Sequence, residues 1–354
     1  MTSGNQFSNN LYAGWQKVVS EYQKPDIRTS IWQVINSYGG YFAGLSLMYF
    51  SLSVGYWLTL LLSIPTAGFL MRIFIIQHDC GHGSFFKSRQ ANDIVGTICG
   101  TLTLIPYRFW RRSHAIHHSN HAELEERGTG DIWTLTIDEY IQSARWKRIA
   151  YRVFRNPFFL FIIAPTINFA ILSRFTYGVD WAKRAERISV HGTNLAIAGW
   201  LAAAVALIGL SATVGIVLPV VFFASGFGTF LFYVQHQFEE TYWEHTPDWD
   251  FTLAALEGSS YYELPLVLQW FTGNIGFHHI HHLSPRIPNY KLQRCHEENV
   301  LFQQAPKLTL WSSLKTTSLA LWDENQERLV SFREALEIYY ADAAAQVEPA
   351  VKIA

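Results

Sequence analysis

Two five-residue stretches of this 354-residue chain carry histidine at their first, fourth and fifth positions. They read HAIHH at residues 114–118 and HHIHH at residues 278–282, and a shorter relative, HDCGH at residues 78–82, has two histidines four positions apart. On a helix, positions i, i+3 and i+4 lie on one face. Each stretch can therefore aim these histidines at one centre, while His279, the additional histidine of the third stretch, points elsewhere.

The repeated spacing predicts a metal site, because neutral imidazole is a good ligand for iron, copper, zinc and nickel. Eight clustered imidazoles are too many for one ion, so two ions are the natural number. The three cysteines include no CxxC pair, and neither disulfides nor thiolate metal sites are expected. The eight candidate ligands are His78, His82, His114, His117, His118, His278, His281 and His282.

The composition favours a membrane protein. Apolar residues make up 49% of the chain and charged residues only 16%, and the 13 Trp, 17 Tyr and 25 Phe are an aromatic content suited to membrane interfaces. The formal net charge of −1 and the dispersed basic residues argue against a nucleic-acid partner. The first 30 residues are polar and lack an apolar core, which argues against a cleaved signal peptide.

Hydropathy predicts an all-α integral membrane fold with four transmembrane helices arranged as two hairpins. Each predicted span is long enough for a bilayer, which takes about 20 residues. The four spans are residues 31–53, 56–76, 192–210 and 212–234. The apolar run 93–106 is too short to cross and is predicted to be interfacial or re-entrant. The run 158–175 is predicted to lie flat on the interface, because the second and third histidine stretches can meet only if an even number of spans separates them.

Basic residues concentrate between the two hairpins, whose own turns contain no Lys or Arg. The positive-inside rule therefore predicts that the histidines and both termini are cytoplasmic. The chain is expected to be a single domain, 1–354, with a cytoplasmic helical cap from residues 77–190 and 235–330 and an amphipathic tail, 331–354. The three histidine clusters would close over the cytoplasmic mouth of the bundle, which favours a lipid or fatty acyl substrate. Two irons with a nitrogen-rich shell can activate dioxygen and attack an unactivated C–H bond.

The three stretches and their surroundings resemble the histidine boxes of the membrane fatty-acid desaturases, in particular those of the bacterial acyl-lipid type. The resemblance rests on HDCGHGSFF at 78–86, GTGDIWTLT at 128–136 and HHIHHLSPRIPNY at 278–290, and it spans about residues 77–290. It implies a non-heme diiron enzyme of the bacterial inner membrane. Such an enzyme uses dioxygen and two electrons to insert a cis double bond into a long acyl chain, with release of water.

The resemblance also implies that all eight box histidines bind iron, and it adds His236, which follows the fourth predicted span in YVQHQF. An Asn that holds a metal-bound water in some relatives corresponds to Phe232 here, and Asn274 is an alternative for that role. Asp79 and Asp131 either orient ligand imidazoles from behind or are solvated loop charges. The other histidines are expected to be structural, namely His121, His191, His245, His279 and His296.

Several alternatives stay open at this point. A fatty-acid or lipid hydroxylase, conjugase or ketolase would use the same boxes, although the flanking motifs favour desaturation. A membrane metal transporter is disfavoured, because the span centres contain no ionisable residue and all three histidine clusters lie on one side.

The sequence also leads to expectations about the electron donor, the substrate and the position of the double bond. No HPGG motif of a fused cytochrome domain is present, so a separate electron donor such as ferredoxin is expected, and a basic cytoplasmic face suits an acidic donor. Acyl-lipid, acyl-CoA and acyl-carrier-protein substrates are not separable by chemistry, and the resemblance favours membrane lipid acyl chains. A Δ12-type or Δ5-type activity on C16 or C18 chains is favoured.

Overall fold

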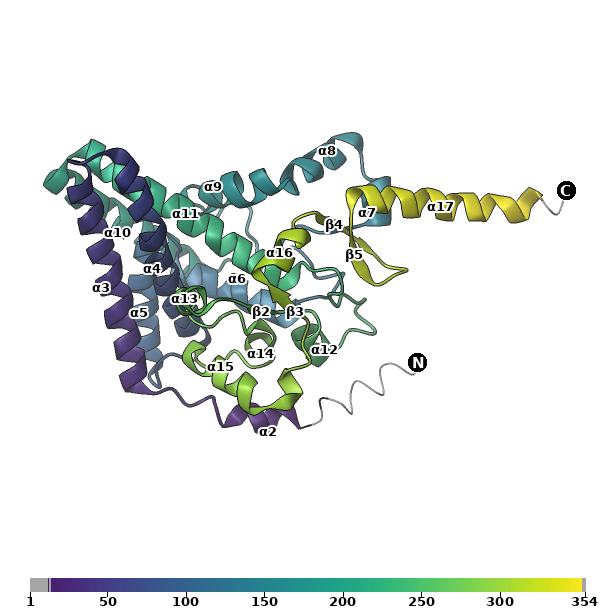
Figure 1. Ribbon diagram of the computed structural model, residues 1–354, viewed down its shortest axis with the longest axis horizontal. Coiled ribbons are helices and arrows are strands. Elements are labelled where there is room, and N and C mark those ends of the chain that lie inside the picture. Colours follow the sequence, from purple (N-terminus) through teal and green to yellow (C-terminus); the bar gives the residue numbers. More distant parts are fainter. Residues whose placement is uncertain (1–11, 13, 352–354) are drawn as a thin grey trace.

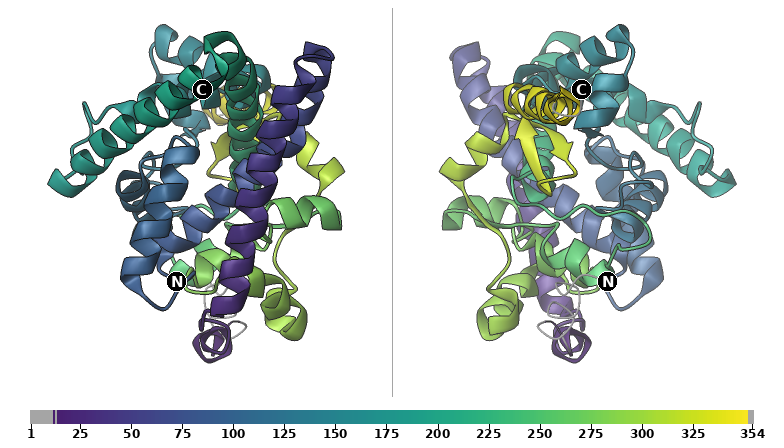
Figure 2. Two further views of the ribbon diagram at one scale, coloured as in Figure 1. Left: turned by 90° about the vertical axis from the view of Figure 1, so that its left-hand side faces the viewer. Right: turned by 90° about the vertical axis from the view of Figure 1, so that its right-hand side faces the viewer.

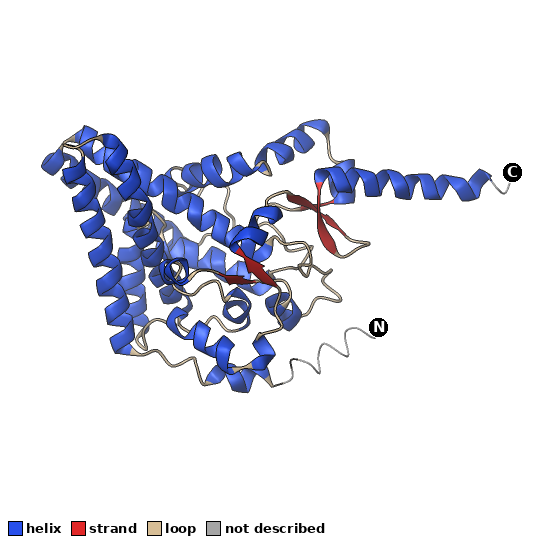
Figure 3. Cartoon of the chain, viewed as in Figure 1, coloured by secondary structure: helices blue, strands red, loops and turns tan. Residues whose placement is uncertain are grey.

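The computed structural model describes residues 12 and 14–351, and this part of the chain is mostly helical (Figures 1 and 3). The α-helices are α2 (Trp15–Ser20), α3 (Ile27–Ser51), α4 (Tyr56–His82), α5 (Arg89–Leu102), α6 (Tyr107–Asn120), α7 (Ile137–Gln142), α8 (Arg145–Phe154), α9 (Ala164–Ala170), α10 (Arg184–Ile208), α11 (Leu210–His236), α12 (Phe251–Leu256), α13 (Leu266–Phe271), α14 (His278–Leu283), α15 (Asn289–Glu298), α16 (Leu310–Thr316) and α17 (Phe332–Val351). A π-helical turn, η1 (Phe159–Ile163), and the 3-10 turns η2 (Leu172–Arg174) and η3 (Val300–Phe302) join some of them.

Helix α4 is the central element, and it packs against α3, α5 and α11. Its contact with α3 is close, because a Cβ on Gly44 would lie only 2.4 Å from the Thr66 hydroxyl oxygen. Figure 1 shows α3, α4 and α5 running side by side. Helix α4 continues six residues past the predicted span end at 76, so the first histidine stretch forms its last turns.

Three helices of the described residues are long and apolar enough to cross a membrane, namely α4, α10 and α11. The predicted spans 56–76 and 212–234 fall on α4 and α11, and 192–210 overlaps α10, which ends at Ile208 because Gly209 makes the turn. Helix α8 and the segment Phe159–Arg174 meet at 64° and would count as a fourth only as a broken span or a re-entrant loop. The flat placement of 158–175 and the arrangement of four spans in two hairpins therefore stay predictions.

The remaining predicted span, 31–53, falls on the 25-residue helix α3, which is not among the three apolar helices. Its buried side carries polar groups that serve as contacts. Gln33 donates from Nε2 to Asn289 Oδ1 at 3.0 Å, and Asn36 accepts from the Arg72 guanidinium at 3.3 Å. Helix α3 thus overlaps the predicted span but begins four residues earlier and ends two residues earlier, and its composition is more polar than that of α4.

The prediction of an all-α fold was wrong in detail, because five short strands are present among the helices (Figure 3). A three-stranded sheet has the order β1-β4-β5, with β1 parallel and β5 antiparallel to β4. Strands β2 and β3 form a separate parallel pair. The turn between β4 and β5 brings two short apolar runs together and buries Trp322 and Leu329. The strands are β1 (Leu135–Thr136), β2 (Tyr261–Glu263), β3 (Lys307–Thr309), β4 (Leu319–Asp323) and β5 (Arg328–Ser331).

Helices are also present in the predicted interfacial run 93–106, in the tail from residue 331 and at the second and third histidine stretches. The apolar run 93–106 overlaps α5, whose 14 residues begin after the N-cap Ser88. The tail predicted from residue 331 is helical as α17, which projects away from the molecule on the side opposite α3 (Figures 1 and 2). The second and third histidine stretches lie on α6 and α14, so their helical spacing is real.

Candidate metal centre

Four helix segments bring the nine predicted histidines together. His78 and His82 come from the last turns of α4, and His236 is the last residue of α11. The others lie on the C-terminal half of α6 and on the short helix α14. They form two adjoining groups.

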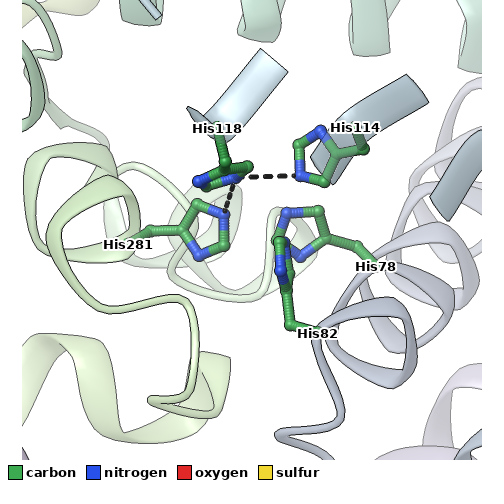
Figure 4. Close-up of side chains that lie close together, drawn as sticks. All are labelled: His78, His82, His114, His118 and His281. Carbon is green, nitrogen blue, oxygen red and sulfur yellow. Dashed lines mark hydrogen bonds between the residues drawn. The ribbon is translucent and has the colours of Figure 1, made fainter. Parts of the chain in front are cut away.

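The first group contains five imidazoles whose potential ligand atoms all lie within 4.8 Å of one another. Figure 4 shows these rings facing one centre from three helices. The Nε2 atom of His118 lies 3.1 Å from that of His114 and 3.0 Å from that of His281. The members of group one are His78, His82, His114, His118 and His281.

The second group contains His117, His236 and His282, whose potential ligand atoms also lie within 4.8 Å of one another. His278 belongs with them, because its Nε2 atom is 3.0 Å from His236 Nε2. Its ring centroid lies 4.7 Å from that of His282. Group two therefore has four predicted members, and together the two groups account for all nine.

Local contacts fix the helix ends that carry these histidines. The buried Tyr107 begins α6 and donates from its hydroxyl to the Cys80 carbonyl at 2.8 Å, which ties α6 to the end of α4. Gln235, next to His236, donates to the Ile275 carbonyl at 2.9 Å and so ties α11 to the turn before α14. Gly273 in that turn has φ +53°, and a Cβ there would lie 2.9 Å from the Ile75 side chain, so glycine suits both the backbone and the close approach to α4.

The nitrogen atoms of both groups fit a metal. Buried imidazole nitrogens without a hydrogen-bond partner in the described residues include His82 Nε2, His117 Nε2 and His282 Nε2. Such atoms are costly unless something binds them. Burial, followed by repulsion from neighbouring imidazoles, holds the pKa of His114, His118, His278, His281 and His282 well below the ordinary value. These five imidazoles are therefore neutral near pH 7, and the neutral imidazole is the form that binds metals.

Each group has one carboxylate behind it. In group one, Asp79 Oδ1 lies 3.2 Å from His78 Nδ1, while Asp79 Oδ2 accepts from the backbone and side-chain amides of Asn289 at 2.7 and 2.8 Å. In group two, Asp131 Oδ1 lies 2.6 Å from His117 Nδ1. A carboxylate on Nδ1 fixes the tautomer that turns Nε2 toward a metal. Of the two alternatives for Asp79 and Asp131, the contacts fit carboxylates that orient imidazoles rather than solvated loop charges.

Asn274 and Phe232, the two positions considered for the Asn that holds a metal-bound water in some relatives, have different surroundings. Asn274 accepts from Gln269 Nε2 at 3.0 Å and donates to the Asn289 carbonyl at 3.4 Å, so its amide faces α13 and α15. Phe232 instead lies against the group, with its ring centroid 5.2 Å from that of His117 and 5.0 Å from that of His236.

Two histidines that were expected to be structural have different surroundings. His279 points away, as predicted, and its Nε2 atom lies 3.4 Å from His296 Nδ1. His121 instead lies against group two, and with His117 and Asp131 it forms a further set of potential ligand atoms within 4.8 Å. Burial, and then repulsion from His117, lowers the pKa of His121 to about 4. The sequence did hold a signal, because His121 follows His117 by four positions and therefore lies on the same helical face.

A cavity of about 490 Å³ adjoins both groups and reaches His78, His114 and His278. This volume is within the usual range of small-molecule pockets, roughly 300–1,000 Å³. Trp110 lies at the metal end of the cavity and stacks on His114 with ring centroids 4.5 Å apart. Most of the lining is apolar, and it includes Leu70, Met71, Phe74, Ile75, Val221 and Ala224.

The fold and the site together define a class, a mostly helical protein with three helices apolar enough to cross a membrane and with histidine clusters that could hold metal beside an apolar cavity. The model of the family described as "Fatty acid desaturase" matches residues 55–313. This chain belongs to the fatty acid desaturase family, whose members are oxidoreductases.

Three relatives illustrate this membership. The chain is 46% identical over 317 residues to a "Fatty acid desaturase" of Bacillus subtilis, and the match covers 90% of each chain. It is 30% identical over 240 residues to the "sn-1 oleoyl-lipid 12-desaturase" of a Synechocystis species, covering 66% of each. It is also 28% identical over 236 residues to the "sn-1 acyl-lipid omega-3 desaturase (ferredoxin)" of the same organism, covering 64% of this chain and 62% of that one.

Proposed function

We propose that this chain is an acyl-lipid desaturase that inserts a cis double bond into a long acyl chain, using dioxygen and two electrons. The observation that carries this proposal is that histidines of both groups, His78, His114 and His278, line a largely apolar cavity. An extended hydrocarbon chain suits such a cavity. The proposed iron ligands are His78, His82, His114, His117, His118, His236, His278, His281 and His282.

Two irons in these groups would supply dioxygen activation, the chemistry that side chains lack. The balanced reaction takes the acyl chain, dioxygen, two electrons and two protons to the unsaturated chain and two waters. Asp79 and Asp131 would accept from the Nδ1–H groups of His78 and His117, keeping the opposite nitrogens directed inward. Trp110 and Phe232 would exclude water from the metal end of the cavity, because their rings pack against His114 and His236.

The membrane arrangement is part of the proposal. We place four spans in two hairpins, with α3 and α4 forming the first hairpin and α10 and α11 the second. The metal centre and both termini would then be cytoplasmic, in a bacterial inner membrane. Support comes from the apolar character of α4, α10 and α11 and from the basic residues between the hairpins.

The names of two relatives support a proposal for the substrate and the electron donor. One relative is named for acting on an oleoyl lipid at position 12, and another is named with ferredoxin. We propose membrane lipid acyl chains of C16 or C18 length as the substrate and a ferredoxin-type protein as the donor. A Δ12-type or Δ5-type position of attack is favoured.

The test is the fatty-acid profile of a bacterium that expresses this chain with a ferredoxin system. The expected result is a new unsaturated species, with its double bond located by mass spectrometry, that is absent when His117→Ala is expressed instead. A hydroxylated species with no unsaturated one would assign the same centre to hydroxylation. An unchanged profile from membranes in which the protein holds two irons and receives electrons would contradict both.

A further inference from the structure

The two histidine groups have unequal numbers of predicted ligands, five in group one and four in group two. One more imidazole lies beside the smaller group. The ring centroid of His121 is 4.3 Å from that of His236, 4.7 Å from that of His282 and 5.3 Å from that of His117. The corresponding distances among those three rings are 4.7 to 5.0 Å. His121 is therefore as close to His236 and His282 as the three members are to one another, and it lies slightly farther from His117.

The hydrogen bonds of His121 settle which of its nitrogens is available. Its Nε2 atom lies 2.9 Å from the Gly258 carbonyl oxygen, which can only accept, so Nε2 carries the proton. In this neutral tautomer Nδ1 keeps an unprotonated lone pair, which is what a metal ligand requires. The residue as a whole is only 3% exposed, so the ring lies inside the fold beside group two.

The surroundings fix the backbone of His121 and pack closely against its ring. Trp249 donates from its indole nitrogen to the His121 carbonyl oxygen at 2.9 Å. At Gly258, a Cβ would lie 3.0 Å from His121 Nε2 and 2.5 Å from the Ala254 carbonyl oxygen, so a larger residue would push the loop and the ring apart. Phe232 covers another side of His236 with an apolar ring, which offers no ligand atom there.

We infer that His121 is a fifth imidazole ligand of group two and binds the second metal through Nδ1. It follows His117 on the same face of the chain and, with His117 and Asp131, forms a compact set of potential ligand atoms. Both groups would then have five imidazoles. The inference rests on the proposed function, because it requires that group two binds a metal.

Two substitutions separate a ligand from a hydrogen-bonding residue. His121→Gln keeps an amide that can donate to the Gly258 carbonyl but has no imidazole nitrogen, whereas His121→Ala removes both. The matched control is His279→Ala, which removes a buried histidine outside both groups. Each full-length protein would be purified in lipid nanodiscs, loaded with ⁵⁷Fe(II), titrated with a chelator and examined by Mössbauer spectroscopy.

We expect wild type and His279→Ala to hold two irons. In both His121 variants, one of the two irons should be removed by chelator about 10–100-fold more readily, with a change in only one of the two Mössbauer signals. Wild-type behaviour of His121→Gln, with or without a defect in His121→Ala, would overturn the assignment, since the hydrogen bond alone would then explain the residue. Failure of wild type to hold two irons would instead overturn the proposed function.

Discussion

The two histidine groups are built in different ways, although they adjoin each other. Group one takes all five of its imidazoles from the three histidine stretches that are visible in the sequence, on α4, α6 and α14. Group two needs His236 from the end of α11, which stands alone in the sequence, and it has His121 and Phe232 against it. The other three members of group two also come from the histidine stretches, so the groups differ in the one ligand that no local repeat marks. Substitutions around group two should therefore have more varied effects.

The largest effect is expected from His117→Ala. His117 lies in group two, and its Nε2 atom is buried without a hydrogen-bond partner in the described residues. The product should fall to the background level, and bound iron should fall below two per chain while the protein still inserts into membranes. Lipid analysis and metal analysis on the same membranes check this. Retained product would remove His117 from the ligand set.

The next largest effects are expected from substitutions of Asp79 and Asp131. They compare the carboxylate contact of group one with that of group two. Asp131→Ala should weaken iron binding about 10–100-fold, because His117 loses the contact that fixes its tautomer. Asp79→Ala should weaken iron binding at group one. It should also cost about 1–3 kcal/mol of folding free energy, because the buried amides of Asn289 lose their acceptor. Chelator titration and thermal unfolding of both variants separate the two effects. Equal losses of stability would show that the two carboxylates act alike.

Phe232→Ala should leave both irons in place and act on the substrate. The side chain lines the cavity and touches two rings of group two, so its loss would allow the acyl chain to shift. Product formation should fall by about 10–100-fold, the cost of a small misplacement of reacting atoms. The double-bond position should also become less uniform, as measured by mass spectrometry. Phe232→Leu, which keeps an apolar side chain, should show a smaller change, and an equal change would argue against a steric role.

His279→Ala should change metal binding and activity little, since this ring lies against His296 outside both groups. Its burial predicts a loss of about 1–3 kcal/mol of stability, typical of a buried polar truncation. Product per folded protein and melting temperature measure the two quantities. If activity fell as far as in His117→Ala, the assignment of helix faces on α14 would be wrong.

The smallest effect is expected for His245, whose contribution to stability should depend on pH. The exposed His245 lies 2.5 Å from Glu125 and 3.1 Å from Glu324, and the hydrogen bond to Glu125 is the main cause that raises its pKa above 6.5. This contact therefore stabilises the folded chain fully below pH 6.5, and its contribution is lost as pH rises through the raised pKa. His245→Ala should lower the melting temperature slightly at pH 6 and not at pH 9. A difference that persists at pH 9 would show that charge is not the cause.

What the sequence could predict also differs between the two histidine groups. The spacing within residues 114–118 and 278–282 predicted two helical faces, and the structure has both. The sequence predicts a structural role for His121; its spacing from His117 gives it the same helical face, but nothing in the sequence shows the Gly258 carbonyl that orients its ring. The strands β4 and β5 were also missed, since short apolar runs near a membrane protein's end do not reveal their pairing partner. Helix α3 was taken for an apolar span, and its polar contacts with Arg72 and Asn289 become apparent only after packing.

Helices α6 and α14 each contribute histidines to both groups, so these two helices also set the distance between the groups. On α6, His117 belongs to one group and His118 to the other, and on α14 the same holds for His282 and His281. Neighbouring helical residues differ by 1.5 Å in rise and about 100° in direction. The separation of the two centres is therefore a fixed property of two short helices rather than of loops that can drift. One residue inserted between His114 and His117 would rotate one pair of ligands away from the other and destroy the spacing itself.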